Sequence, residues 1–214
     1  MEHELEKIKA CPICGSESHK KHVEGRDHNV SGKLFTITEC LSCGFRFTNP
    51  RPKEEYIYKY YQSKDYISHS STKKGIINKV YHLVRFYQFY KKRSIIRRVS
   101  KIKTGKILDI GCGTGDFLKY MHSSGWETDG VETDLGAKLI AEKKLGKKIE
   151  EKFDQIKGEK KYDVISMWHV LEHVYNLEGC LKKVNKLLKK DGVLVVGVPN
   201  CASYDALKYK ENWV

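Results

Sequence analysis

Apolar and polar residues in the second half of the chain follow two alternating patterns. Apolar, strand-like runs end in glycine or polar turns, and they predict strands at residues 106–110, 127–131, 148–150, 162–168 and 193–198. Between them, apolar residues recur every three or four positions, which predicts helices that begin near Asp116 and Asp134. In the second of these helices we expect Leu135, Leu139 and Ile140 to face the core. Strands and helices in alternation are typical of a parallel α/β sheet.

The first half is organised differently, with a long helix predicted over residues 75–100. Its expected core face consists of Ile76, Val80, Val84, Tyr87, Ile95 and Val99. Upstream, residues 33–39 predict a strand and residues 53–62 a short helix rich in tyrosine. We therefore expect an N-terminal module over 1–50, a helical linker over 51–104 and an α/β domain over 105–214.

The first strand of the α/β domain runs into a glycine loop. Asp109 is followed by Gly111, Gly113 and Gly115 at alternate positions, and then by Asp116. Glycines permit positive φ and let a ligand touch bare backbone. A phosphate-binding loop would need Lys after its last glycine, and the dinucleotide fingerprint would need a third glycine where Asp116 stands. Acids at both ends and no base inside favour a cationic ligand such as S-adenosylmethionine.

At these residues the chain resembles the class I S-adenosylmethionine-dependent methyltransferases, over about residues 105 to 200. The resemblance implies a Rossmann-like sheet. Glu132, at the end of the next strand, matches the acidic residue that binds the cofactor ribose in that family. Asp154 lies in the region where the family contacts adenine, and Trp168 ends the fourth strand. The cofactor-binding residues expected on this basis are Asp109, Gly111, Cys112, Gly113, Gly115, Glu132, Asp154 and Trp168.

Residues 11–43 hold two Cys-x-x-Cys-Gly pairs, Cys11 with Cys14 and Cys40 with Cys43. Two such knuckles predict a four-cysteine zinc ribbon, closed by four sulfurs and therefore structural. A redox dithiol and disulfides are the alternatives. The first is disfavoured because the motif occurs twice. The second is disfavoured because the polar start of the chain predicts a cytoplasmic protein with reduced thiols.

The segment after the fourth strand carries His169, Glu172 and His173, which one helical turn would place on one face. The spacing matches inverted zinc proteases, but the surrounding order of motifs argues against that assignment. Three roles stay open. A histidine acts as general base on the acceptor, or Glu172 binds a divalent ion with the histidines, or the segment fixes the loop by hydrogen bonds.

The net charge of +13 is concentrated in residues 73–106, which hold twelve Lys or Arg and no Asp or Glu. This segment either attracts a polyanion such as RNA or is a solvated face. No apolar run approaches the ~20 residues that span a bilayer, so we expect no membrane partner. Asn49-Pro-Arg-Pro52 and the tyrosines after it resemble the joint of zinc-ribbon sugar methyltransferases. These tyrosines (Tyr56, Tyr58, Tyr60, Tyr61 and Tyr66) either line a substrate pocket or pack the module.

The predicted fifth strand is followed by Pro199 and one more helix from Ser203 to about Glu211. The family resemblance implies two further strands. An apolar strand left at an edge invites pairing. The expectation is therefore a truncated sequence, a gene fragment, or a homo-oligomer that covers this edge.

Three functions follow from these patterns. The first is methyl transfer to a small-molecule acceptor, with a nucleotide-linked or polysaccharide sugar the first candidate. The second is an RNA methyltransferase that uses the basic segment. The third is a zinc-dependent binding module without catalysis.

Overall fold

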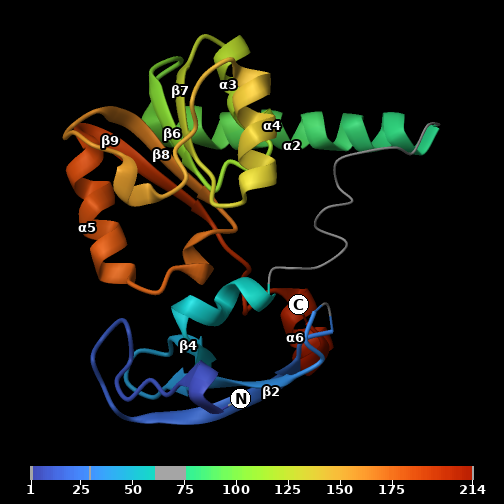
Figure 1. Cartoon of the computed structure of the whole chain (residues 1–214), viewed down its shortest axis with the longest axis vertical. Coiled ribbons are helices and arrows are strands. Elements are labelled where there is room, and N and C mark those ends of the chain that lie inside the picture. Colours follow the sequence, from blue (N-terminus) through green and yellow to red (C-terminus); the bar gives the residue numbers. More distant parts are fainter. Residues whose placement is uncertain (1, 29, 61–75, 214) are drawn as a thin grey trace. The chain divides into compact units, whose positions relative to one another are not determined.

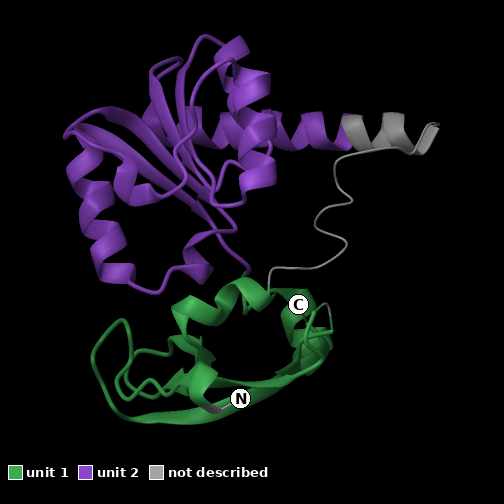
Figure 2. Ribbon diagram, viewed as in Figure 1, with its two compact units in different colours: residues 1–72, 200–214 green, residues 73–199 purple. Residues whose placement is uncertain are grey.

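The computed structural model describes residues 2–28, 30–60 and 76–213, with the backbone alone for residues 2 and 76–82. These residues divide into two compact units, coloured separately in Figure 2. One comprises residues 1–72 together with 200–214, and the other residues 73–199. Tyr61 and Tyr66 of the predicted joint lie outside the described residues. None of the described helices has the length and apolar composition needed to cross a membrane.

The N-terminal unit is built on small antiparallel sheets (Figure 1). β2 (His19–Arg26), β3 (Leu34–Cys40) and β4 (Arg46–Thr48) form one sheet in that order, and β1 (Leu5–Glu6) pairs with β5 (Arg51–Pro52). Three short helices accompany them: η1 (Glu2–Glu4), η2 (Glu54–Tyr60) and α6 (Tyr204–Tyr209), which continues into η5 (Lys210–Asn212). η5 lies against β2, so the chain returns to this unit after the α/β sheet.

The second unit is the predicted parallel α/β sheet. Its strands are β6 (Lys106–Ile110), β7 (Glu127–Val131), β8 (Tyr162–Trp168) and β9 (Leu188–Gly197), in the order β7-β6-β8-β9. All neighbours pair in parallel. The predicted strand at 148–150 is reduced to a single bridge between Val131 and Glu150.

Helices cover both faces of this sheet (Figure 1). α2 (Ile76–Ser100), α3 (Asp116–Ser123) and α4 (Leu135–Leu145) contribute Ile96, Phe117, Leu118, Met121 and Ala141 to one core. α5 (Leu177–Leu187) packs against the opposite face through Val184 and Leu187. The short helices η3 (Phe153–Gln155) and η4 (Leu171–His173) lie in loops at the strand ends.

Two predicted helix faces are wrong. On α2, Val84, Tyr87, Ile95 and Val99 are exposed, whereas Ile96 is buried and Phe89 packs against the same core. On α4, the exposed positions are Leu135, Leu139 and Ile140, and Ala141 is buried. In both helices the inward residues are fixed by what they pack against, which the apolar pattern of a single helix does not reveal.

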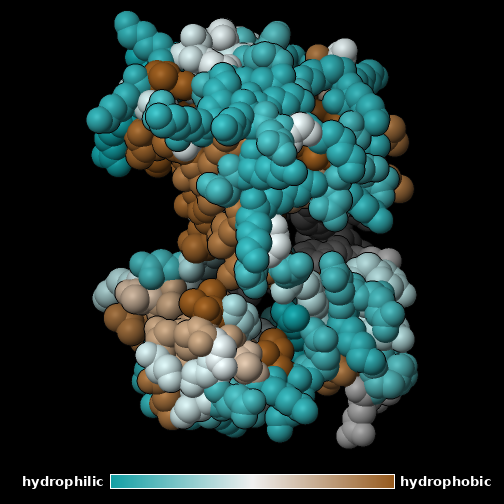
Figure 3. Space-filling model, turned by 90° about the vertical axis from the view of Figure 1, so that its left-hand side faces the viewer, coloured by the Kyte–Doolittle hydropathy of each residue, from teal (hydrophilic) through white to brown (hydrophobic). Residues whose placement is uncertain are grey.

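β9 lies at the edge of the sheet and, within the part of the chain that the structure describes, pairs only with β8. Val195 is buried, but Val196 and Val198 are exposed. Figure 3 views the molecule from the side where β9 lies and shows a band of hydrophobic surface on this unit. An edge of this kind is open to further pairing.

Candidate functional site

The glycine loop links β6 to α3, and its three glycines all have positive φ, at +72° for Gly111, +54° for Gly113 and +73° for Gly115. At two of them, a neighbouring side chain lies close to the place that a Cβ would occupy. A Cβ at Gly111 would collide with Val170, and one at Gly115 would lie 3.0 Å from the Cβ of Ala141. A Cβ at Gly113 would meet nothing within 4 Å. At Gly113 the loop therefore leaves open space where a side chain would stand.

Glu132 follows β7 and is buried. Its two carboxylate oxygens accept hydrogen bonds from the backbone N–H groups of Gly113, at 2.7 Å, and Asp134, at 2.8 Å. A carboxylate has about four acceptor positions, so each oxygen retains capacity for one further donor. Glu132 thus holds the loop in place and can still accept hydrogen bonds from vicinal hydroxyls.

Asp109 lies on β6, beneath the loop, and is almost completely buried. The hydroxyl of Ser166 on β8 donates a 2.5 Å hydrogen bond to one of its oxygens. Burial raises the pKa of Asp109 to about 6, against the hydrogen bond from Ser166 and the charge of Lys92, which lower it. A cationic group placed here would favour the ionised carboxylate.

Lys92 of α2 enters the same region, and the sequence pattern did not single it out. Its ammonium lies 4.6 Å from the ring centre of Trp168 and 5.4 Å from that of Phe117. Burial lowers its pKa, and the charge of Asp109 partly offsets this effect. Lys92 makes no ion pair within 4 Å among the described residues. Its place between Phe89 and Ile96, on the buried face of α2, is the signal that distinguishes it from the neighbouring bases.

Asp116 does not act as the second open acid that the sequence predicted. Its carboxylate pairs with Arg85 of α2 and, at 2.6 Å, with Lys144 of α4, and it accepts a hydrogen bond from the Thr114 hydroxyl. Burial alone would raise its pKa, but the bonds from Lys144 and Thr114 and the charge of Arg85 lower it below the usual range. Asp116 therefore ties three elements of this unit together.

The other predicted cofactor residues differ in their surroundings. Cys112 is buried, and its backbone N–H donates to the carbonyl of Val131. Burial raises the pKa of the Cys112 thiol, which keeps the thiol neutral. Trp168 makes an edge contact with Phe117, and its indole Nε1 is buried without a hydrogen-bond partner among the described residues. Asp154 points away into solvent, with a 95% exposed side chain 3.2 Å from the Lys183 ammonium.

His169 comes directly after β8 and has a positive φ of +58°. Its Nδ1 lies 3.6 Å from a carboxylate oxygen of Glu172, and its side chain is 73% exposed. His173 lies at the end of η4, where its backbone N–H donates a hydrogen bond to the carbonyl of Val170. His169 and Glu172 therefore lie side by side at the carboxyl end of the sheet, and the ring of His169 is accessible from solvent.

The four cysteines of the N-terminal unit come together as predicted. All four Sγ atoms lie within 4.8 Å of one another, with Cys11 to Cys43 and Cys14 to Cys40 at 3.6 Å. A Zn–S distance of about 2.3 Å places the sulfurs of a tetrahedral site about 3.8 Å apart. Gly15 and Gly44 follow the two pairs with φ of +72° and +73°, as tight knuckle turns require.

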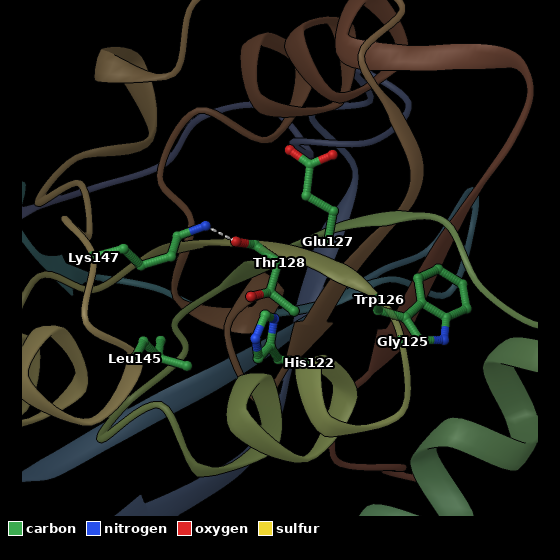
Figure 4. A pocket seen from close by; sticks show the side chains of 7 residues that line it. All are labelled: His122, Gly125, Trp126, Glu127, Thr128, Leu145 and Lys147. Atoms are coloured by element: carbon green, nitrogen blue, oxygen red, sulfur yellow. Dashed lines mark hydrogen bonds between the residues drawn. The ribbon is translucent and has the colours of Figure 1, made fainter.

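The second unit also has a surface pocket, which lies away from the glycine loop. Trp126, Glu127, Thr128 and Lys147 are among its lining residues (Figure 4). These residues lie at the amino end of β7, whereas the glycine loop follows the carboxyl end of β6. Lys147 is already used there, because its ammonium donates to the Thr128 carbonyl and to Asp129. Ligands of open α/β sheets bind at the carboxyl ends, so this pocket is not the candidate site.

Residues 84–214 match the family model described as a methyltransferase domain. A ubiquinone biosynthesis O-methyltransferase of Pelagibacter ubique is 33% identical over 105 residues, which cover 46% of this chain and 44% of the relative. An uncharacterized protein of Methanocaldococcus jannaschii is 32% identical over 145 residues, covering 63% of this chain and 56% of the relative. The chain thus spans about half the length of the curated relatives it matches.

Solved structures with a similar arrangement include the sugar N-methyltransferase KedS8 of a Streptoalloteichus species. It is 19% identical, with a TM-score of 0.47, covering 60% of this chain and 56% of that one. The family model covers more than half of the present sequence and includes the whole glycine loop, Glu132 and the segment after β8. The chain therefore belongs to the family of S-adenosylmethionine-dependent methyltransferase domains, here preceded by a four-cysteine cluster.

Proposed function

We propose that this protein transfers a methyl group from S-adenosylmethionine to a small-molecule acceptor. The observation that carries this proposal is the backbone opening at Gly113, which is bordered by the buried carboxylates of Glu132 and Asp109. A loop that is open at one glycine and lined by acids suits a cationic nucleoside and repels a phosphate.

Each polar group of the opening has a counterpart on that cofactor. The free acceptor positions of Glu132 suit the ribose hydroxyls, and Asp109 suits the amino-acid ammonium. Lys92, a half-buried cation without a carboxylate partner among the described residues, suits the amino-acid carboxylate. S-adenosylmethionine, when bound, supplies an already activated methyl group.

The protein then has to align the acceptor and exclude water, and a base is needed only for a hydroxyl or an acidic carbon. His169 is our candidate for that base, with Glu172 as the group that orients it. His173 is the second candidate for the base, and a divalent ion held by this segment is the alternative. Asp154 is the weakest of the cofactor assignments because its side chain is directed to solvent.

For the acceptor, we propose first a nucleotide-linked or polysaccharide sugar. Support comes from the likeness of Asn49-Pro-Arg-Pro52 and the ribbon to the joint of sugar methyltransferases. A phenol is the second candidate, because a relative that is 33% identical over 105 residues is a ubiquinone biosynthesis O-methyltransferase. RNA is the third, and the support for it is the run of bases along residues 73–106.

We also propose that the four cysteines hold one structural zinc ion. The support is the match between the Sγ separations of 3.6 Å and a tetrahedral sulfur site. Four sulfurs leave no open position, so the ion would stabilise the N-terminal unit and take no part in the reaction.

The test is a turnover assay with radiolabelled S-adenosylmethionine and three acceptor panels: nucleotide sugars, catechols and structured RNA. We expect label in a sugar or a phenol, and less label from Glu132→Ala when the cofactor is limiting. Label in RNA that falls steeply with salt would favour the nucleic-acid function instead. Binding without transfer to any acceptor would leave the non-catalytic module.

A further inference from the structure

The half-buried side chain of Lys92 covers the ring of Trp168 in the structure. Its ammonium lies over the indole, 4.6 Å from the ring centre. The ring of Phe117 meets Trp168 edge to face and lies 5.4 Å from the same ammonium. Within the described part of the chain Lys92 has no carboxylate in direct contact, whereas Arg85 of the same helix pairs with Asp116. Aromatic faces attract a cation less strongly than a carboxylate in contact does.

Trp168 stands at the carboxyl end of β8, directly before His169. Its indole lies against Gly197 at the end of β9, where a Cβ would come within 2.7 Å of the ring. Gly197 therefore leaves the space that the indole occupies. The indole Nε1 is buried and has no hydrogen-bond partner among the residues that the structure describes, which is an exception for a polar group in a folded protein. Because ligands of open α/β sheets bind at the carboxyl ends of the strands, the indole stands where an acceptor would lie.

We propose that Trp168 is the platform on which the acceptor ring lies, and that Lys92 covers this platform until the cofactor binds. The inference rests on the proposed function, in which the carboxylate of S-adenosylmethionine is the partner of Lys92. When that carboxylate arrives, the ammonium leaves the indole face for a charge-assisted hydrogen bond. The flexible four-carbon stem of lysine permits this change of partner. The face of Trp168 is then free, so the cofactor binds first and the acceptor second.

The platform also defines the class of acceptor. An indole face stacks on a flat and uncharged ring face, such as that of a phenol or the apolar side of a sugar ring. The residue after Trp168 is His169, the candidate base for a hydroxyl on such a ring. Lys92 thus acts as a positioning residue, because it binds the cofactor and clears the place of the acceptor.

Calorimetry with two nucleosides tests the role of Lys92. S-adenosylhomocysteine carries the amino-acid carboxylate, and 5′-methylthioadenosine has the same nucleoside and sulfur without it. In Lys92→Met the affinity for S-adenosylhomocysteine should fall roughly tenfold or more, and that for 5′-methylthioadenosine should change by less than about twofold. Lys92→Arg, which keeps the charge, should retain part of the lost affinity. The matched control is Lys91→Met, which replaces an exposed lysine whose ammonium lies over Tyr87 and should change neither affinity.

Quenching of tryptophan fluorescence by acrylamide tests the uncovering of Trp168. The chain has three tryptophans; Trp126 is buried, and Trp213→Phe removes the third, so that Trp168 is the reporter. S-adenosylhomocysteine should make Trp168 more accessible to acrylamide, and 5′-methylthioadenosine should not. Catechol or UDP-glucose should then protect Trp168, but only when S-adenosylhomocysteine is present. Circular dichroism verifies that each variant is folded.

The outcomes separate this inference from the proposed function. Failure of S-adenosylhomocysteine to bind the wild-type chain would overturn both. If it binds, an equal affinity in Lys92→Met, or an equal loss for both nucleosides, would overturn the inference alone. So would a Trp168 that S-adenosylhomocysteine leaves unchanged or covers. Protection by catechol or UDP-glucose without S-adenosylhomocysteine would overturn the order of binding, and protection by neither would overturn Trp168 as the platform.

Discussion

The backbone N–H of Gly113 donates a 2.7 Å hydrogen bond to the carboxylate of Glu132. This bond joins the open glycine of the loop to the end of β7, the neighbouring strand. It fixes the loop at a glycine that has open space at its Cβ position, and it places an acid beside this glycine. In the proposed site, cofactor binding and loop stability are therefore coupled through a single side chain.

Replacing Glu132 should affect both properties. In Glu132→Ala the N–H groups of Gly113 and Asp134 lose their acceptor, which costs about 1–3 kcal/mol of stability. Cofactor affinity should fall by a similar free energy. Glu132→Gln, which keeps one acceptor oxygen, should lose less of both. Urea denaturation and calorimetry with S-adenosylhomocysteine measure the two effects, and an unchanged affinity in Glu132→Ala would refute the assignment.

The glycines of the loop should respond differently to alanine. Both Gly113→Ala and Gly115→Ala strain a residue at positive φ, by about 1–2 kcal/mol. Gly115→Ala also crowds Ala141 at 3.0 Å and should lose about 1–3 kcal/mol more stability. Gly113→Ala has no such neighbour, so we expect a smaller loss of stability and the larger loss of cofactor binding. If the two variants lost cofactor affinity in the same proportion to their loss of stability, the result would contradict this division.

The raised pKa of Asp109 predicts the direction in which the stability of the chain changes with pH. Its pKa is raised to about 6 in the folded chain, so the native state binds more protons than the unfolded state between about pH 4 and pH 6. Its contribution to stability is therefore lost as the pH rises through that window. The stability of Asp109→Asn relative to wild type should rise over the same range. Denaturation at pH 4, 5, 6 and 7 measures this, and a difference that is constant with pH would contradict it.

Asp116 should prove structural. Asp116→Asn breaks its pairs with Arg85 and Lys144, and we expect a loss of about 1–3 kcal/mol in stability, with cofactor affinity nearly unchanged where the variant is folded. Because the pKa of Asp116 is lowered, its stabilisation is present at neutral pH and lost in acid. Lys143→Met, which removes an exposed neighbour of Lys144, is the control. A selective loss of affinity in Asp116→Asn would restore the role first expected from the sequence.

Metal removal should act on the N-terminal unit. A strong chelator or Cys40→Ser should release one zinc ion per chain, detected with a chromogenic indicator, and should lower the melting temperature. Cys201→Ser, which replaces an exposed cysteine outside the cluster, should change neither. A chain purified with all four thiols free and without metal would contradict the zinc assignment.

Much of the fold was predictable because the signals are local. The three glycines of the loop have the positive φ that their spacing suggested, β6 and β7 have the predicted bounds, and α4 begins where it was predicted. The inward faces of α2 and α4 were not predictable in this way. Ala141 is buried because Gly115 leaves room for it, and that pairing joins residues 26 positions apart.

The site, too, was predictable from the sequence only in part. The four cysteines come together as their spacing required, and Asp109 and Glu132 lie beside the loop. In the sequence, Lys92 is one of a run of basic residues with nothing to distinguish it. Only the packing of Phe89 and Ile96 shows that it points inward. Asp116 looked like a ligand group because Arg85 and Lys144 are remote in the sequence. Long-range ion pairs of this kind leave no periodic trace.

Titration calorimetry of the chain with S-adenosylmethionine tests the central assignment most directly. We expect one site per chain, binding that is lost in Gly113→Ala and weakened in Glu132→Ala, and no heat from nucleoside triphosphates or dinucleotides. Absence of binding to S-adenosylmethionine, or tighter binding of a phosphorylated nucleotide, would contradict the account.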